Sequence, residues 1–289
     1  MLRRDALSRA SRAAALPKRA LVRGAKTALR RGSRGKPVPL PTLIRLRRFG
    51  GRTNMLTFRT ASVVRDGTAL TNPFLADGLG DRRFGDWTIS AQAMNLLERD
   101  IRARTPRRVL EFGSGLSTAC LARYMAENAL DAPRPSVISL EQDAGFCAET
   151  RKVVAELHLD ELVAVHHAPL LQKDVAGRTV NVYDLPASVL SELEKQPPEL
   201  VFIDGPGKAG GRLGRWAVLH VVIPLLPRGF RFFLDDALLD SALESAQLWD
   251  EIPGVRIAGV ALVGHGVLVG EFVRRTAASR TPPPAAGRR

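Results

Sequence analysis

Acidic side chains occur at the ends of several short apolar segments in this 289-residue chain. A buried charge without a partner is costly, so a strand in a protein core has no structural reason to end in one. Carboxylates that meet at one edge repel each other and favour a cation, which here would be a positively charged ligand, Lys208 or a metal. The acids are Glu111, Glu141, Asp204, Asp235 and Asp236. We expect them to share one edge of a sheet.

A loop with two glycines follows the first of these segments. Residues 109–118 read Val-Leu-Glu-Phe-Gly-Ser-Gly-Leu-Ser-Thr, which predicts a strand, a tight turn and the start of a helix. Such a turn lets the backbone approach a ligand, and the helix directs N–H groups at it. A nicotinamide-binding loop would need a third glycine where Thr118 stands. The charge of Glu111 suits a cationic ligand, and Glu141 is placed to accept both hydroxyls of a ribose.

Strands and helices alternate along the predicted body of the protein. The strands are expected at residues 108–112, 136–140, 162–166, 200–203 and 230–234, and the helices at 89–101, 117–128, 144–157, 212–226 and 238–249. Two further apolar runs, 255–263 and 267–272, are separated only by Gly-His-Gly, so they form an antiparallel hairpin. The pattern predicts a doubly wound α/β sheet of seven strands, mostly parallel, which ends in that hairpin.

The ordered set of motifs resembles the class I S-adenosylmethionine-dependent methyltransferases over about residues 87–272. The motifs are Glu111-Phe-Gly-Ser-Gly, Glu141, Phe-Ile-Asp204-Gly-Pro and Leu-Asp235-Asp236. The resemblance implies a strand order of 3-2-1-4-5-7-6, with the glycine loop under the methionine part of the cofactor and Glu141 on its ribose. It implies that the cofactor-binding residues are Glu111, Phe112, Gly113, Ser114, Gly115, Ser117, Thr118, Glu141, Gln142, His167 and Asp204. Ser117 stands where many members have a third glycine, and its hydroxyl would bond the cofactor's carboxylate.

A narrower resemblance concerns the catechol-type O-methyltransferases. Asp204, Asp235 and Asp236 are similar to the positions that hold Mg²⁺ in those enzymes, where the last is usually Asn. Lys208 is similar to their base, one residue further from Asp204. Oxygen ligands of this kind suit Mg²⁺, but many relatives keep acids here without a metal, so metal dependence remains open. His265, in the terminal hairpin turn, is interpreted as a turn residue.

The activity that these residues predict is O-methylation of a small-molecule acceptor. Methyl transfer from a sulfonium is an in-line displacement, so positioning and a base for the acceptor's proton are what the protein must supply. The catalytic residues would be Asp204, Lys208, Asp235 and Asp236. Two alternatives remain: a non-catalytic module with this fold that binds RNA or an anionic membrane surface, and a nicotinamide oxidoreductase, against which Glu111 and Thr118 argue.

Positive charge is concentrated at the N-terminus. The net charge is +14, but residues 1–52 contain sixteen of the 43 Lys and Arg residues and one of the 29 acids, so the remainder is close to neutral. Residues 1–52 therefore form a predicted basic leader. Three interpretations of this leader are compatible with its sequence. It is a disordered tail, an amphipathic helix that binds an anionic membrane or nucleic acid, or an organelle-targeting peptide.

The predicted domains follow from this division. A cap at 53–86 follows the leader, a methyltransferase-like domain spans 87–273, and 274–289 form a disordered tail. No apolar run reaches the ~20 residues that a membrane helix needs, and two cysteines exclude a disulfide-rich secreted scaffold. These features predict a cytoplasmic protein, or one that the leader directs to a membrane surface or an organelle.

Overall fold

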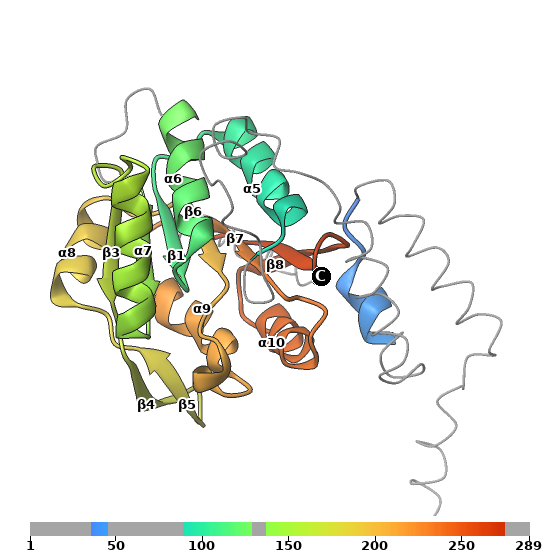
Figure 1. Cartoon of the computed structure of the whole chain (residues 1–289). Coiled ribbons are helices and arrows are strands. Elements are labelled where there is room, and N and C mark those ends of the chain that lie inside the picture. Colours follow the sequence, from blue (N-terminus) through green and yellow to red (C-terminus); the bar gives the residue numbers. More distant parts are fainter. Residues whose placement is uncertain (1–35, 46–88, 129–136, 275–289) are drawn as a thin grey trace, which may run out of the picture.

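A seven-stranded sheet forms the centre of the protein (Figure 1). The computed structural model describes residues 36–45, 89–128 and 137–274. The sheet has the order β3-β2-β1-β6-β7-β9-β8, in which β9 runs antiparallel to both neighbours and the other pairs are parallel. The strands are β1 (Val109–Phe112), β2 (Val137–Glu141), β3 (Val163–His167), β6 (Leu200–Ile203), β7 (Phe230–Leu234), β8 (Val255–Ala261) and β9 (Val267–Phe272). This is the predicted order, and the predicted fold class is confirmed.

Helices cover both faces of the sheet because successive strand residues point to opposite sides. On β1, Val109 packs into the cluster that contains α5, α6 and α7, whereas Leu110 packs into the cluster that contains α8, α9 and α10. The helices are α5 (Ala91–Arg104), α6 (Leu116–Asn128), α7 (Ala144–Glu156), α8 (Ala187–Lys195), α9 (Gly214–Leu225) and α10 (Asp240–Asp250). Figure 1 shows α6 and α7 side by side across the sheet. The five predicted helices agree with α5, α6, α7, α9 and α10 to within three residues at each end, whereas α8 was not predicted.

The register of the parallel strands brings the acidic strand ends into one row. Phe112 pairs with Leu140 on one side and with Ile203 on the other, and Ile203 pairs with Leu234. The next residues along the chain are therefore neighbours at the carboxyl edge of the sheet. They are Gly113, Glu141, Asp204 and Asp235. The expected shared edge is therefore found for Glu141, Asp204 and Asp235, whereas Glu111 lies inside β1, paired with Ser139 and Phe202.

A second sheet, which the sequence did not predict, lies between β3 and α8. Strands β4 (Leu170–Val175) and β5 (Arg178–Tyr183) form an antiparallel hairpin. Ala176 and Gly177 both have positive φ, of 51° and 73°, as a two-residue turn that matches the strand twist requires. Tyr183, at the end of β5, contacts Gln142 at the carboxyl edge of the main sheet.

Part of the predicted leader belongs to the folded body. Val38 forms an antiparallel bridge with Val260 of β8, with N···O distances of 2.7 and 2.9 Å. Residues 40–45 are helical, and Leu40 and Leu43 are buried in the core. This segment covers the exposed edge of β8, which would otherwise offer unpaired backbone groups. For residues 36–45, a leader separate from the folded domain is therefore the wrong description.

Other predicted segments lie outside the described residues. These are the remainder of the leader, with its predicted amphipathic helix, the cap at 53–86 and the tail from 275 onward. Within the described ranges, none of the helices combines the length and apolar character needed to cross a bilayer.

Candidate functional site

Backbone groups meet closely where the sheet order reverses, between β1 and β6. The N–H groups of Asp204 and Gly205 both donate to the carbonyl of Phe112, at 2.9 and 2.6 Å. Gly113 has φ of 91°, and a Cβ there would lie 2.7 Å from the nitrogen of Gly205. Only glycine fits both the conformation and the space. The reversal point of an α/β sheet is where ligands bind, and here its two loops pack directly together.

Glu111 is fully buried beneath the glycine loop. Three hydroxyls donate to its carboxylate, from Ser117 at 2.6 Å, Thr118 at 2.5 Å and Ser139 at 2.6 Å. Burial raises the pKa of Glu111 to about 7, although these hydrogen bonds oppose the shift. The predicted hydroxyl contact from Ser117 to a cofactor carboxylate is therefore replaced, because Ser117 and Thr118 direct their hydroxyls inward at Glu111.

Glu141 organises the glycine loop from the end of β2. Its carboxylate accepts the N–H of Ser114 at 2.8 Å, the hydroxyl of Ser114 at 3.2 Å and the N–H of Asp143 at 3.0 Å. The hydroxyls of Ser114 and Thr150 are 2.9 Å apart. A carboxylate with this support is fixed in orientation, as a ligand-binding group at a strand end must be. Glu141 thus lies at the end of β2, as predicted, and the structure adds its contacts with the glycine loop.

The residues after β2 and β3 lie beside this carboxylate. His167 pairs with Glu141 across the sheet, and its Nε2 is 3.3 Å from the carbonyl of Gln142. The hydroxyl of Tyr183 donates to Oε1 of Gln142 at 2.8 Å, and its ring packs edge-on against Phe112. Gln142 and His167, both predicted at the cofactor site, are therefore adjacent. Tyr183 joins them from the hairpin that the sequence did not predict.

An arginine occupies the centre of the acidic group that follows β6 and β7. Nη2 of Arg215 lies 3.4 Å from Asp204 and 3.2 Å from Asp236, and its Nη1 donates to the backbone carbonyl of Asp235 at 3.0 Å. Burial raises the pKa of Asp204 to about 6. Burial also raises the pKa of Asp235 well above its ordinary value, and the negative charges of Asp204 and Asp236 add to that shift. The expected cation is thus Arg215 of α9. Lys208, the candidate predicted from the sequence, is exposed on the short helix η1 (Lys208–Gly210).

These acids do not fit Mg²⁺. The ion would need oxygen atoms free to coordinate it, yet the Arg215 guanidinium already pairs with Asp204 and Asp236. The described ranges contain no cluster of three or more His, Cys, Asp or Glu side chains arranged for a metal. The Mg²⁺ positions implied by the resemblance to catechol-type enzymes are therefore corrected to a built-in ion-pair network.

His265 reaches the same network from the β8–β9 turn. Its Nδ1 is 3.1 Å from Oδ1 of Asp236. The interpretation as a turn residue is correct for its backbone but overlooked this contact. Arg215 was also missed, although it is the one Arg, Lys, Asp or Glu in the otherwise apolar helix α9. An isolated charge in an apolar helix was the available signal, because such a charge needs a partner.

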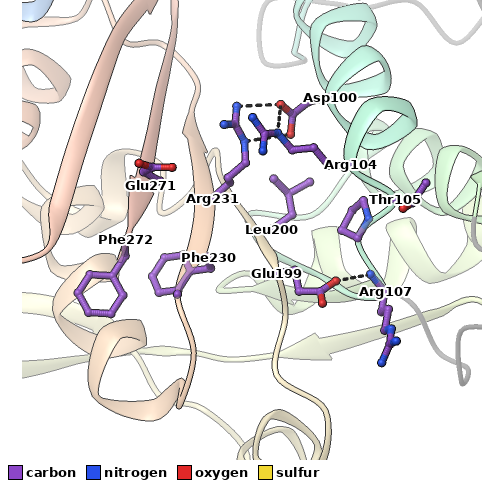
Figure 2. A pocket seen from close by; sticks show the side chains of 12 residues that line it. Asp100, Arg104, Thr105, Arg107, Glu199, Leu200, Phe230, Arg231, Glu271 and Phe272 are labelled. Carbon is purple, nitrogen blue, oxygen red and sulfur yellow. Dashed lines mark hydrogen bonds and ion pairs between the residues drawn. The ribbon is translucent and has the colours of Figure 1, made fainter. Parts of the chain in front are cut away.

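The hollow shown in Figure 2 opens at the opposite edge of the sheet, where β6 and β7 begin. It has a volume of about 510 Å³. Much of its charge is already paired: Arg231 contacts Asp100 at 2.8 Å, and Glu199 accepts the N–H of Arg107 at 2.6 Å. It contains none of the predicted site residues, which all lie at the carboxyl edge or on the loops that follow it.

Comparison with known proteins agrees with this architecture. Residues 110–237 match a family described as a methyltransferase domain. That range begins in β1 and ends just beyond the Asp235–Asp236 pair, so it contains the glycine loop and all of the predicted acids. None of the curated protein sequences matches the chain.

Solved structures resemble the fold at low sequence identity. An O-methyltransferase from Bacillus cereus in complex with SAH has a TM-score of 0.52 at 16% identity, covering 76% of this chain and 100% of that one. An SAH-bound methyltransferase from Podospora anserina has a TM-score of 0.51 at 16% identity, with 76% and 96% covered. A methyltransferase from Geobacter sulfurreducens has a TM-score of 0.50 at 16% identity, with 73% and 95% covered.

The sheet order, the helices on both faces and these likenesses define a class I methyltransferase fold. Within that fold, residues 110–237 are the part that resembles the family described as a methyltransferase domain.

Proposed function

We propose that the protein is an S-adenosylmethionine-dependent methyltransferase that methylates an oxygen of a small molecule. The observation that carries the proposal is the fixed Glu141 carboxylate beside the glycine loop, at the point where the sheet order reverses. The methyltransferase-domain match supports it. Structures of the same fold from Bacillus cereus and Podospora anserina hold SAH, which supports the same choice of cofactor.

Different residues at the carboxyl edge would bind different parts of S-adenosylmethionine. Glu141 would accept the ribose hydroxyls, and the backbone of Gly113 to Gly115 would lie against the methionine part. Gln142 and His167 would flank the adenine. When bound, S-adenosylmethionine supplies a methyl group on a positively charged sulfur, ready for in-line displacement. The chain's own contribution is to hold the acceptor in line and to remove its proton.

Incorporation of label tests the proposal directly. The purified chain is incubated with S-adenosylmethionine labelled in its methyl group and with the small-molecule fraction of a cell extract. We expect saturable binding of S-adenosylmethionine, measured by calorimetry, and label in small molecules. Absence of saturable binding would overturn the proposal. Label that enters only RNA or protein would overturn the choice of a small-molecule acceptor.

Replacing Glu141 with Gln should weaken S-adenosylmethionine binding about tenfold. The substitution keeps the shape but removes the charge, and a hydrogen bond to a charged group contributes about 1.5–3 kcal/mol against about 1 kcal/mol for a neutral one. Calorimetric titration measures the change. Glu149→Gln on the exposed face of α7 is the matched control and should leave the affinity unchanged. Equal affinities for both variants would remove Glu141 from the cofactor site.

Magnesium should change neither stability nor activity. Because Arg215 already pairs with the acids, we expect the same thermal unfolding midpoint and the same rate of label transfer in Mg²⁺ and in EDTA. A metal that bound the folded state would stabilise it by about 2.7 kcal/mol at a hundred times its dissociation constant, which a thermal scan detects easily. A midpoint that rises and saturates with added Mg²⁺ would contradict the ion-pair network as the resident cation.

A further inference from the structure

His265 and Asp236 are held together at the carboxyl edge by backbone as well as by side-chain contacts. The turn between β8 and β9 is tied to the loop after β7, since the N–H of Ala237 donates to the carbonyl of Gly266 at 2.8 Å and that of Leu238 to the carbonyl of His265 at 3.1 Å. The imidazole and the carboxylate therefore belong to two connected loops. Their spacing does not depend on the conformations of long flexible side chains.

Asp236 is fixed in orientation from both sides. Its Oδ1 faces Nδ1 of His265 at 3.1 Å, and its Oδ2 pairs with Nη2 of Arg215 at 3.2 Å. Its backbone has φ of 54°, a conformation that a residue with a side chain adopts uncommonly and that tends to occur at functional sites. The carboxylate thus has one oxygen for each partner.

The pairing leaves one ring nitrogen of His265 available. When Nδ1–H donates to Asp236, Nε2 of the neutral ring keeps its electron pair. No described residue is recorded as hydrogen-bonded to Nε2, and the side chain is 40% exposed. Through Asp236 the pair is joined to the network, because Asp236 pairs with Arg215 and Arg215 pairs with Asp204.

We propose that His265 is the base that accepts the proton of the acceptor hydroxyl, with Asp236 and Arg215 as positioning residues. This inference rests on the proposed function. The electron pair of Nε2 takes the hydroxyl proton, and the acceptor oxygen forms a bond to the methyl carbon. The electron pair of the breaking carbon–sulfur bond remains on sulfur, which becomes neutral. Asp236 stabilises the imidazolium until its proton passes to water, which is the role that a carboxylate has behind a catalytic histidine.

This assignment differs from the predicted base, Lys208. A charged lysine has three donors and no electron pair to accept a proton, so it must first be deprotonated. A neutral imidazole already has an electron pair on its second ring nitrogen. The fixed carboxylate behind its ring is the arrangement that keeps one tautomer and one orientation.

Two substitutions separate a base from a structural residue. His265→Asn keeps an N–H donor for Asp236 but has no nitrogen that can take a proton, and His265→Ala leaves space for added imidazole. The matched control is His158→Asn, because His158 is exposed after α7 and its φ of 54° suits Asn. For each variant, calorimetry measures S-adenosylmethionine affinity, and the labelled cofactor with the small-molecule extract fraction measures transfer.

We expect both His265 variants to bind S-adenosylmethionine as the wild type does and to transfer label at least ~100-fold more slowly, which is the usual contribution of a positioned base. Added imidazole should restore transfer by His265→Ala. Near wild-type transfer of label by His265→Asn would overturn the inference. So would a His265→Ala variant that binds S-adenosylmethionine but whose transfer of label is not restored by imidazole. If the wild-type chain itself binds no S-adenosylmethionine or transfers no label, the proposed function fails, and this inference fails with it.

Discussion

Replacing Arg215 with Met should lower the free energy of unfolding by about 3 kcal/mol at pH 8. The methionine fills most of the same volume but leaves Asp204 and Asp236 without their cation. Removal of one partner of a buried ion pair typically costs 3–5 kcal/mol, and we expect the lower end because these side chains remain 16–24% exposed. Urea unfolding at pH 8 and at pH 5 measures the loss.

The pH dependence of this loss identifies its cause. Burial already raises the pKa of Asp204 to about 6, with Arg215 acting in the opposite direction. At pH 5 the acids of the variant take up protons, so the loss should shrink. Arg212→Met is the control, because Arg212 pairs with Glu244 on the surface at 2.5 Å and is 69% exposed. Such a pair contributes at most about 1 kcal/mol. Equal losses for the two variants, or a loss at pH 5 as large as at pH 8, would contradict the network.

The central sheet was predictable because its strands are short, apolar and bounded by strong signals. Leu200–Ile203, Phe230–Leu234 and Val267–Phe272 begin and end at the predicted residues, and each begins directly after a charged residue or a glycine. The β4–β5 hairpin gave no comparable signal. Most of β4 is exposed, and an exposed strand needs no apolar pattern. Its turn uses Ala176 at positive φ, where sequence favours Gly or Asn.

The acidic residues illustrate how far the candidate site followed from the sequence. Their convergence could be predicted because the carboxyl ends of parallel strands share an edge. The cation among them could not, because sequence order alone does not say which side chain of α9 reaches back over the sheet. Arg215 lies eleven residues after Asp204 and 21 before Asp236. His265 joins them only because β8 and β9 form the edge beyond β7.

The predicted leader shows the opposite error. Charge counting grouped residues 1–52 together, because basic residues continue through the segment. Val38, Leu40 and Leu43 are nevertheless buried against the body. A short apolar segment between Pro37 and Arg45 is enough to cover an edge strand. The net charge of residues 1–52 does not reveal this segment, because it averages over about fifty residues.

Glu111 should make the wild type lose roughly 3 kcal/mol of stability, relative to Glu111→Gln, between pH 4.5 and pH 8. The folded-state pKa of about 7 lies above the ordinary value of 4.5 because the carboxyl is fully buried. The folded protein therefore binds this proton more tightly than the unfolded chain does. The resulting stabilisation is complete below pH 4.5 and is lost as pH rises through 7. Gln at this position cannot titrate, so the stability of the variant lacks this pH dependence.

The difference between the two stability curves is the quantity to measure, because Asp204 and Asp235 titrate in both proteins and cancel. Urea unfolding at several pH values between 4.5 and 8 gives both curves. Glu149→Gln, on the exposed face of α7, should follow the wild type throughout. If the free energies of unfolding of the wild type and of Glu111→Gln differ by a constant amount across this pH range, Glu111 keeps an ordinary pKa. The hydrogen bonds from Ser117, Thr118 and Ser139 would then fully offset the effect of its burial. If the two stability curves meet at low pH and separate as the pH rises, the carboxyl beneath the glycine loop is protonated at acidic pH and ionises near pH 7.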